Sequence, residues 1–169
     1  MDIEKAINTA IEYEIRVREV FVEAMDEQTE PIGKKIYRLL ADEEDSHVKF
    51  LEETLSTWKQ NGQLSPEGLE TALPSAEAIE REIAKLETSL EKRGADKQIA
   101  LLKKAREVEI ETSEFYRRLI DTLPTEGQEF FRRFLEIEEG HLALVDAEIN
   151  ALDSAGFWFD MSEFDLEKS

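Results

Sequence analysis

Two stretches of the chain, EEDSH (43–47) and EEGH (138–141), decide how this sequence is interpreted. They contain the only two histidines among the 169 residues, and each histidine follows a glutamate by three positions. Residues three apart share one face of a helix. Each stretch can therefore direct a carboxylate and an imidazole toward one point.

The surrounding sequence predicts helices. Apolar residues recur at steps of three and four in four long segments, which we expect to be helices over 2–28, 33–60, 96–122 and 126–153. Short breaks with Pro and Gly, at 29–33 and 124–127, join the helices in two pairs. The segment 61–94 is expected to be a long crossover containing a short helix over 76–93, with Ser75 as its N-cap. The predicted fold class is thus all-α, an antiparallel four-helix bundle with a long crossover between its second and third helices.

Acidic residues and histidines interrupt the inward-facing apolar stripe of every long helix. They are Glu14 in the first helix, Glu44 and His47 in the second, Glu109 in the third, and Glu138 and His141 in the fourth. Corresponding residues of the two halves lie 94 or 95 positions apart. This internal repeat predicts two helical hairpins related by a pseudo-two-fold axis, with the six residues near that axis.

Chance and a hydrogen-bonded polar core are the alternatives to a functional cluster. Glutamate makes up 30 of the 169 residues, so both histidines would follow a glutamate by three positions roughly once in thirty random arrangements. Burying four carboxylates is nevertheless very unfavourable unless positive charge compensates them. No Lys or Arg lies on these stripes near the four glutamates. Two divalent cations would cancel the four negative charges, with neutral imidazoles completing the ligand set.

Other polar residues lie close to the six. Tyr37 and Tyr116 are one or two helical turns away, where each can pack with a hydrogen-bonded hydroxyl. Alternatively, each can donate a hydrogen bond or relay an electron beside the metals. Glu43 and Glu139 each adjoin a predicted ligand, and are expected to support it from outside or to lie at the surface.

Composition excludes several kinds of function. Lys and Arg number 21 and Asp and Glu 40, a formal net charge of −19 that argues against nucleic-acid binding. The absence of cysteine excludes disulfides, thiolate zinc sites, iron–sulfur clusters and a rubredoxin-type iron site. No segment resembles a signal peptide or is apolar enough to span a membrane, so we expect a cytoplasmic protein without membrane partners.

These features together resemble the rubrerythrin and ferritin-like di-iron carboxylate family. The resemblance covers about residues 2–153 and rests on four motifs, AIEYE (10–14), EEDSH (43–47), AREVE (105–109) and EEGH (138–141). It implies a centre of two iron ions, with manganese or zinc as alternatives, that reacts with hydrogen peroxide or dioxygen. It further implies that Glu14 and Glu109 are each the only ligand contributed by their helix. Glu44 and Glu138 would be bridging carboxylates, and His47 and His141 would be the nitrogen ligands.

Two features depart from the rubrerythrin pattern. The sequence has no rubredoxin domain, so electrons are expected from a separate donor protein. Rubrerythrins also tend to have a further glutamate one turn after the ligand of the third helix, where this chain has Thr112. The resulting six-ligand set is similar to that of bacterioferritin-like and manganese-catalase sites.

Four functions follow as hypotheses. The first is a non-haem di-iron oxidoreductase, a rubrerythrin-like peroxidase of oxidative-stress defence. The alternatives are a ferroxidase that handles iron, a manganese-catalase-like enzyme, and a non-enzymatic protein that binds a partner through its aromatic tail. We expect residues 1–155 to form the bundle, the tail 156–169 to pack on it, and the protein to form a homodimer or larger homo-oligomer.

Overall fold

Four long helices and one short helix make up most of this computed structural model, which describes residues 2–83, 95–156 and 158. The helices are α1 (Ile3–Glu27), α2 (Pro31–Asn61), α3 (Ala76–Ile83), α4 (Asp96–Thr122) and α5 (Thr125–Ala155). The prediction of an all-α four-helix bundle with an extra short helix in the crossover is confirmed. No helix within the described residues is both long and apolar enough to cross a lipid bilayer.

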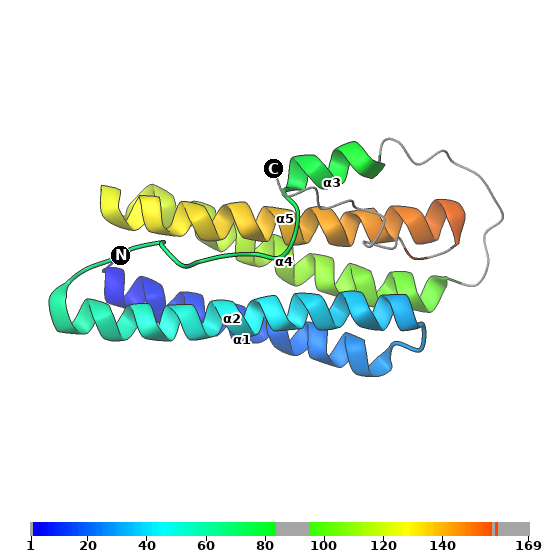
Figure 1. Ribbon diagram of the computed structural model, residues 1–169, viewed down its shortest axis with the longest axis horizontal. Coiled ribbons are helices and arrows are strands. Elements are labelled where there is room, and N and C mark those ends of the chain that lie inside the picture. Colours follow the sequence, from blue (N-terminus) through cyan, green and yellow to red (C-terminus); the bar gives the residue numbers. More distant parts are fainter. Residues whose placement is uncertain (1, 84–94, 157, 159–169) are drawn as a thin grey trace.

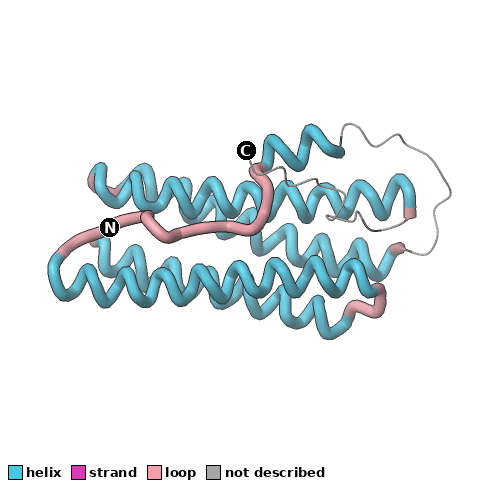
Figure 2. The backbone as a smooth tube through the Cα atoms, viewed as in Figure 1, coloured by secondary structure: helices cyan, strands magenta, loops and turns pink. Residues whose placement is uncertain are grey.

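The long helices form two antiparallel hairpins, α1 with α2 and α4 with α5, which pack together mainly through α1 and α4 (Figure 1). The crossover after α2 runs back along the bundle as an extended segment before α3, as Figure 2 shows. The short helix α3 lies on the outside, against α5. The chain therefore returns along the bundle before α4 begins, which places the second hairpin beside the first.

Local sequence signals fix where the helices begin and end. The Asp2 side chain caps α1 by accepting a hydrogen bond from the Glu4 amide. Helices α2 and α5 are each followed directly by a capping glycine, Gly62 and Gly156, whose φ angles of 67° and 72° suit a residue without a Cβ. The prediction that Pro31 belongs to the break between helices is wrong, because Pro31 is the first residue of α2. Proline fits this position because its missing N–H would have no helical partner there.

The short helix begins as predicted. The Ser75 hydroxyl accepts a hydrogen bond from the Ala78 amide at 3.3 Å, which confirms Ser75 as its N-terminal cap. The structure assigns helix as far as Ile83, and the rest of the predicted span, 84–93, lies outside the described residues.

The core consists of two apolar clusters separated by a polar layer. One cluster contains Val17, Leu40, Ala105 and Leu144 among others. The other contains residues nearer the opposite end of the bundle, including Ala10, Leu51, Phe115 and Phe134. Along each long helix, the predicted polar residues fall between the members of the two clusters. Apolar packing on both sides therefore shields this layer from water.

Trp158 is the described residue of the C-terminal tail that packs against the bundle. Trp158 is 5% exposed and packs edge-on against Tyr37 of α2, with 5.9 Å between ring centroids. It also lies against Gly33, where an added Cβ would come within 2.5 Å of the indole ring. Residues 157 and 159–169 lie outside the described residues, so packing of the whole tail stays a prediction.

Candidate metal centre

Six polar side chains meet in the middle of the bundle, where apolar residues would otherwise continue the core. None has more than 1% of its surface exposed. Helices α1 and α4 contribute one glutamate each, and α2 and α5 contribute one Glu-x-x-His pair each. The six are Glu14, Glu44, His47, Glu109, Glu138 and His141. The structure thus brings together all the predicted ligands, and their binding of a metal stays a prediction.

The six residues form two overlapping groups, each able to hold a cation. Within each group the potential ligand atoms all lie within 4.8 Å of one another. The first group has Glu14 and His47, the second has Glu109 and His141, and both groups include Glu44 and Glu138. The arrangement therefore offers two neighbouring four-residue sites that share two carboxylates.

The imidazole Nδ1 atoms face the carboxylates. His141 Nδ1 lies 2.7 Å from Glu44 Oε1, and His47 Nδ1 lies 3.1 Å from Glu14 Oε2. His47 Nδ1 is also 3.4 Å from one oxygen of each shared glutamate, Glu44 and Glu138. One imidazole nitrogen cannot donate to all of these oxygens at once, whereas a cation among them would accept electron pairs from every one.

The negative charge of the cluster is not balanced by nearby side chains. Among the described residues, no Lys or Arg forms an ion pair with any of the four glutamates. Apart from the nearby imidazole nitrogens, the carboxylate oxygens of Glu44, Glu109 and Glu138 have no hydrogen-bond donor beside them. Burying carboxylates that lack both a counter-charge and hydrogen bonds costs free energy of folding. Bound cations would satisfy both the charge and the free lone pairs, so the residues fit a pair of metal ions.

Without a cation the cluster retains protons. Burial and the neighbouring Glu44 carboxylate raise the pKa of Glu14 to about 7, and burial with Glu138 raises that of Glu109 well above its usual value. Burial alone would lower the pKa of the two imidazoles, but the surrounding carboxylates raise it well above the usual value. Near neutral pH, protons therefore provide part of the positive charge that metal ions would otherwise supply.

Tyr116 of α4 adds a hydroxyl to one side of the centre. Its phenol is fully buried and donates a hydrogen bond to Glu14 Oε1, while Glu14 Oε2 faces His47. Both oxygens of Glu14 are thus engaged, unlike those of Glu109. The predicted placement of Tyr116 beside a ligand agrees with this geometry, and any role in electron transfer stays a prediction.

Glu43 lies behind His141, on the side of the ring away from the other carboxylates. Its Oε2 atom is 3.7 Å from His141 Nε2, an electrostatic contact that is too long for a hydrogen bond. The crossover holds this carboxylate in place, because Thr71 Oγ1 donates to it at 2.5 Å and the Ala72 amide donates at 2.9 Å. Burial alone would raise the pKa of Glu43, but His141, Thr71 and Ala72 together lower it to about 2. Glu43 is therefore a fixed negative charge beside His141.

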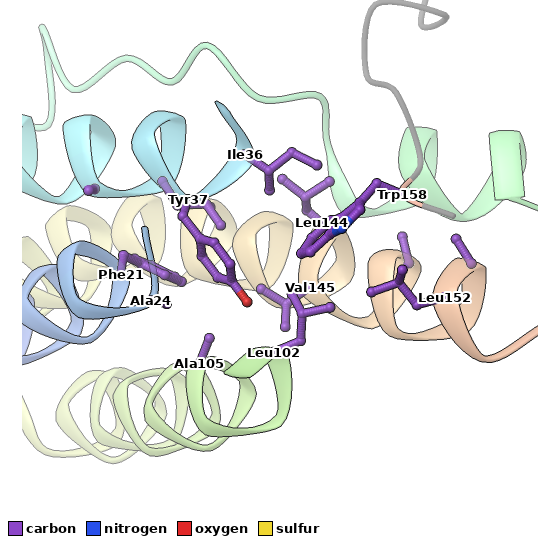
Figure 3. Close-up of a cluster of buried hydrophobic side chains, with 14 of the residues drawn as sticks. Phe21, Ala24, Ile36, Tyr37, Leu102, Ala105, Leu144, Val145, Leu152 and Trp158 are labelled. Atoms are coloured by element: carbon purple, nitrogen blue, oxygen red, sulfur yellow. The ribbon is translucent and has the colours of Figure 1, made fainter. Parts of the chain in front are cut away.

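Tyr37 is placed differently from Tyr116. Its ring contacts Phe21 and Trp158, and its hydroxyl lies within the apolar cluster that also includes Leu102 and Val145 (Figure 3). Burial and the nearby carboxylate of Glu148 raise its pKa. The observed contacts of Tyr37 are those of a packed core residue, and its predicted role beside the metals stays a prediction.

Sequence reasoning missed the support from the crossover. Nothing in the composition of 61–75 indicates that Thr71 and Ala72 lie over α2 and bind Glu43. One signal was present: Glu43 adjoins Glu44, whereas Ile137 holds the matching position before Glu138. The first half of the repeat therefore has a carboxylate at this position, and the second half has an apolar side chain.

Comparison with known proteins leaves the family of this chain open, because no protein-family model, no curated protein and no solved structure gives a significant match to it.

Proposed function

We propose that this chain is a ferritin-like di-iron protein that reduces hydrogen peroxide or dioxygen with electrons from a separate donor protein. The observation that carries this proposal is the pair of overlapping four-residue groups sharing Glu44 and Glu138. One glutamate from each of two helices and one Glu-x-x-His pair from each of the other two is the ligand pattern of di-iron and di-manganese bundles. Carboxylate and imidazole donors suit these metals.

When bound, a pair of ferrous ions supplies the two electrons with which hydrogen peroxide and two protons become two molecules of water. The chain provides the geometry for this reaction. Glu44 and Glu138 would contribute to the binding of both cations, and the neutral imidazoles of His47 and His141 would complete the ligand set without adding charge. The apolar clusters on either side exclude bulk water from the centre.

Anaerobic rapid mixing tests this proposal. Protein loaded with Fe(II) is mixed with hydrogen peroxide, and peroxide, ferrous iron and dissolved oxygen are followed together. We expect one peroxide to be consumed for every two ferrous ions oxidised, without oxygen release. A Glu44→Ala variant should lose this reaction, and the Glu139→Gln variant should keep it because Glu139 is half-exposed and pairs with Arg117.

Other outcomes of the same experiment would replace the proposal. Peroxide consumption no faster than with free Fe(II) would reject a reaction at this centre. Oxygen release from manganese-loaded protein without a reductant would instead indicate manganese-catalase chemistry. Continued oxidation of added Fe(II), with ferric iron accumulating beyond two ions per chain, would indicate the ferroxidase alternative.

A further inference from the structure

The two halves of the candidate metal centre differ at two positions where the internal repeat is broken. Glu43 of α2 faces His141, but the repeat-matched residue on α5, Ile137, offers His47 no carboxylate. Tyr116 of α4 donates to Glu14, but its repeat-matched residue on α1, Phe21, has no hydroxyl to offer Glu109. Each departure places a polar contact on one half of the centre only.

The first difference concerns the histidines. A ring that binds a cation through Nδ1 carries its proton on Nε2, and a carboxylate facing that N–H orients the ring and makes it a stronger ligand. For His141 the facing carboxylate is Glu43, which lies 3.7 Å from Nε2 in electrostatic contact and is held from the crossover by Thr71 and Ala72. Nε2 of each ring is buried without a hydrogen-bond partner, but among the described residues Glu43 forms an ion pair with His141 only and not with His47. We therefore expect the ring of His141 to bind a cation more tightly than the ring of His47.

Glu43 is itself close enough to both histidines to form a third group with ligand-like spacing. A third cation there would need lone pairs from the ring nitrogens that remain after Nδ1 is used. Those nitrogens carry protons when Nδ1 binds a metal. Glu43 therefore serves as a positioning residue for His141 rather than as a ligand of another ion.

The second difference concerns the unshared glutamates. Neither oxygen of Glu109 has a hydrogen-bond partner, and Oε1 lies 3.6 Å from His141 Nδ1. Glu14 has one oxygen engaged by Tyr116 and the other close to His47. In the half with Glu14, the Tyr116 hydroxyl occupies one lone pair of Glu14 Oε1, so fewer lone pairs are freely available to a cation in that half.

Resting on the proposed dinuclear function, we infer that the two cations bind in sequence, the first in the half formed by Glu109 and His141 and the second in the half formed by Glu14 and His47. Glu43 and Tyr116 set this order. Since loss of a carboxylate behind a ligating histidine typically costs about 10- to 100-fold in metal affinity, the two binding steps should differ by a similar factor.

Titration of the metal-free protein with Co(II), followed by calorimetry and visible absorption, tests this order without requiring activity. We expect two steps. The isosteric Glu43→Gln variant should weaken the tighter step by about 10- to 100-fold and leave the weaker step unchanged. The Tyr116→Phe variant should strengthen the weaker step, because it frees one oxygen of Glu14. The half-exposed Glu139→Gln variant is the matched control and should change neither step.

Variants of the two histidines show which half of the centre each binding step belongs to. His141→Gln should remove the tighter step, and His47→Gln should remove the weaker one, with helical content checked by circular dichroism. Two ions of equal affinity, or loss of the weaker step in Glu43→Gln, would overturn the inference and leave the dinuclear proposal standing. A weaker second step in Tyr116→Phe would overturn the role given to Tyr116. Binding of at most one ion to the unmodified chain would reject both the proposed function and the inference.

Discussion

The imidazole rings of His47 and His141 lie parallel, with 5.5 Å between their centroids and 2° between their planes. The two rings come from different hairpins, α2 of the first and α5 of the second. The pseudo-two-fold axis that the sequence repeat predicts would therefore run between the two rings. The candidate metal centre belongs to both hairpins, so its six residues come together only when the hairpins pack against each other.

Shared and unshared glutamates should respond differently to substitution. Glu138 belongs to both four-residue groups, whereas Glu109 belongs to one. Glu138→Ala should therefore weaken the binding of both cations, by roughly 10- to 100-fold or more, whereas Glu109→Ala should weaken only one. Equilibrium dialysis with Co(II), followed by elemental analysis, measures this. Equal loss of one ion in both variants would show that Glu138 does not bridge.

Removal of the metal should destabilise the fold. A cation that binds only the native state stabilises it by about 2.7 kcal/mol at one hundred times its Kd. For a domain of this size that corresponds to a rise in Tm of about 5 to 10 °C for each ion. Thermal unfolding of Co(II)-loaded protein before and after treatment with a chelator checks this. An unchanged Tm would mean that the ion binds the folded and unfolded chains alike, as adventitious surface ions do.

The stability of the metal-free protein should fall as the pH rises. The pKa of Glu14 is raised from 4.5 to about 7 in the folded state, so the folded chain holds this proton more tightly than the unfolded chain. This contribution is fully present below about pH 4.5 and is lost as the pH rises through about 7. The raised pKa values of Glu109 and both histidines act in the same direction.

Urea unfolding of the metal-free protein between about pH 5 and pH 8 measures this dependence. The Glu14→Gln variant, which cannot titrate at this position, should show a shallower fall. Metal affinity should have the opposite pH dependence, because cations displace the protons held by the cluster. Stability of the metal-free protein that rises over this range would contradict the charge arrangement described for the centre.

The contact of Trp158 with Gly33 should be sensitive to a single methyl group. In Gly33→Ala, the new Cβ would lie 2.5 Å from two indole carbons, so Trp158 must move. We expect a loss of about 1 to 3 kcal/mol from overpacking and a red shift of Trp158 fluorescence, measured in a Trp58→Phe background.

Gly140→Ala is the matched control for that substitution. Gly140 is also a buried helical glycine, but an added Cβ would meet only the Pro74 carbonyl oxygen at 3.5 Å, an ordinary contact. This variant should keep the Trp158 emission and gain up to about 1 kcal/mol from the better helix propensity of alanine. Unchanged fluorescence in Gly33→Ala would show that Trp158 is not held against α2.

The long helices and the inward-facing Glu and His residues were predictable because both depend on the period of the helix. Glu14 and Glu109 could be chosen from a glutamate-rich sequence because each interrupts an apolar stripe. The contact of Glu43 with Thr71 and the hydrogen bond from Tyr116 to Glu14 could not be predicted. They depend on how the crossover lies across α2 and on how α4 packs against α1, which no local pattern in the sequence encodes.

The location of bound metal tests the dinuclear centre most directly. Crystals of the full chain, loaded anaerobically with Fe(II), allow diffraction data to be recorded on both sides of the iron absorption edge. We predict two anomalous peaks between the hairpins, one beside Nδ1 of His47 and one beside Nδ1 of His141, with Glu44 and Glu138 contacting both. Fully loaded crystals without a peak among these four side chains would contradict a metal centre in this bundle.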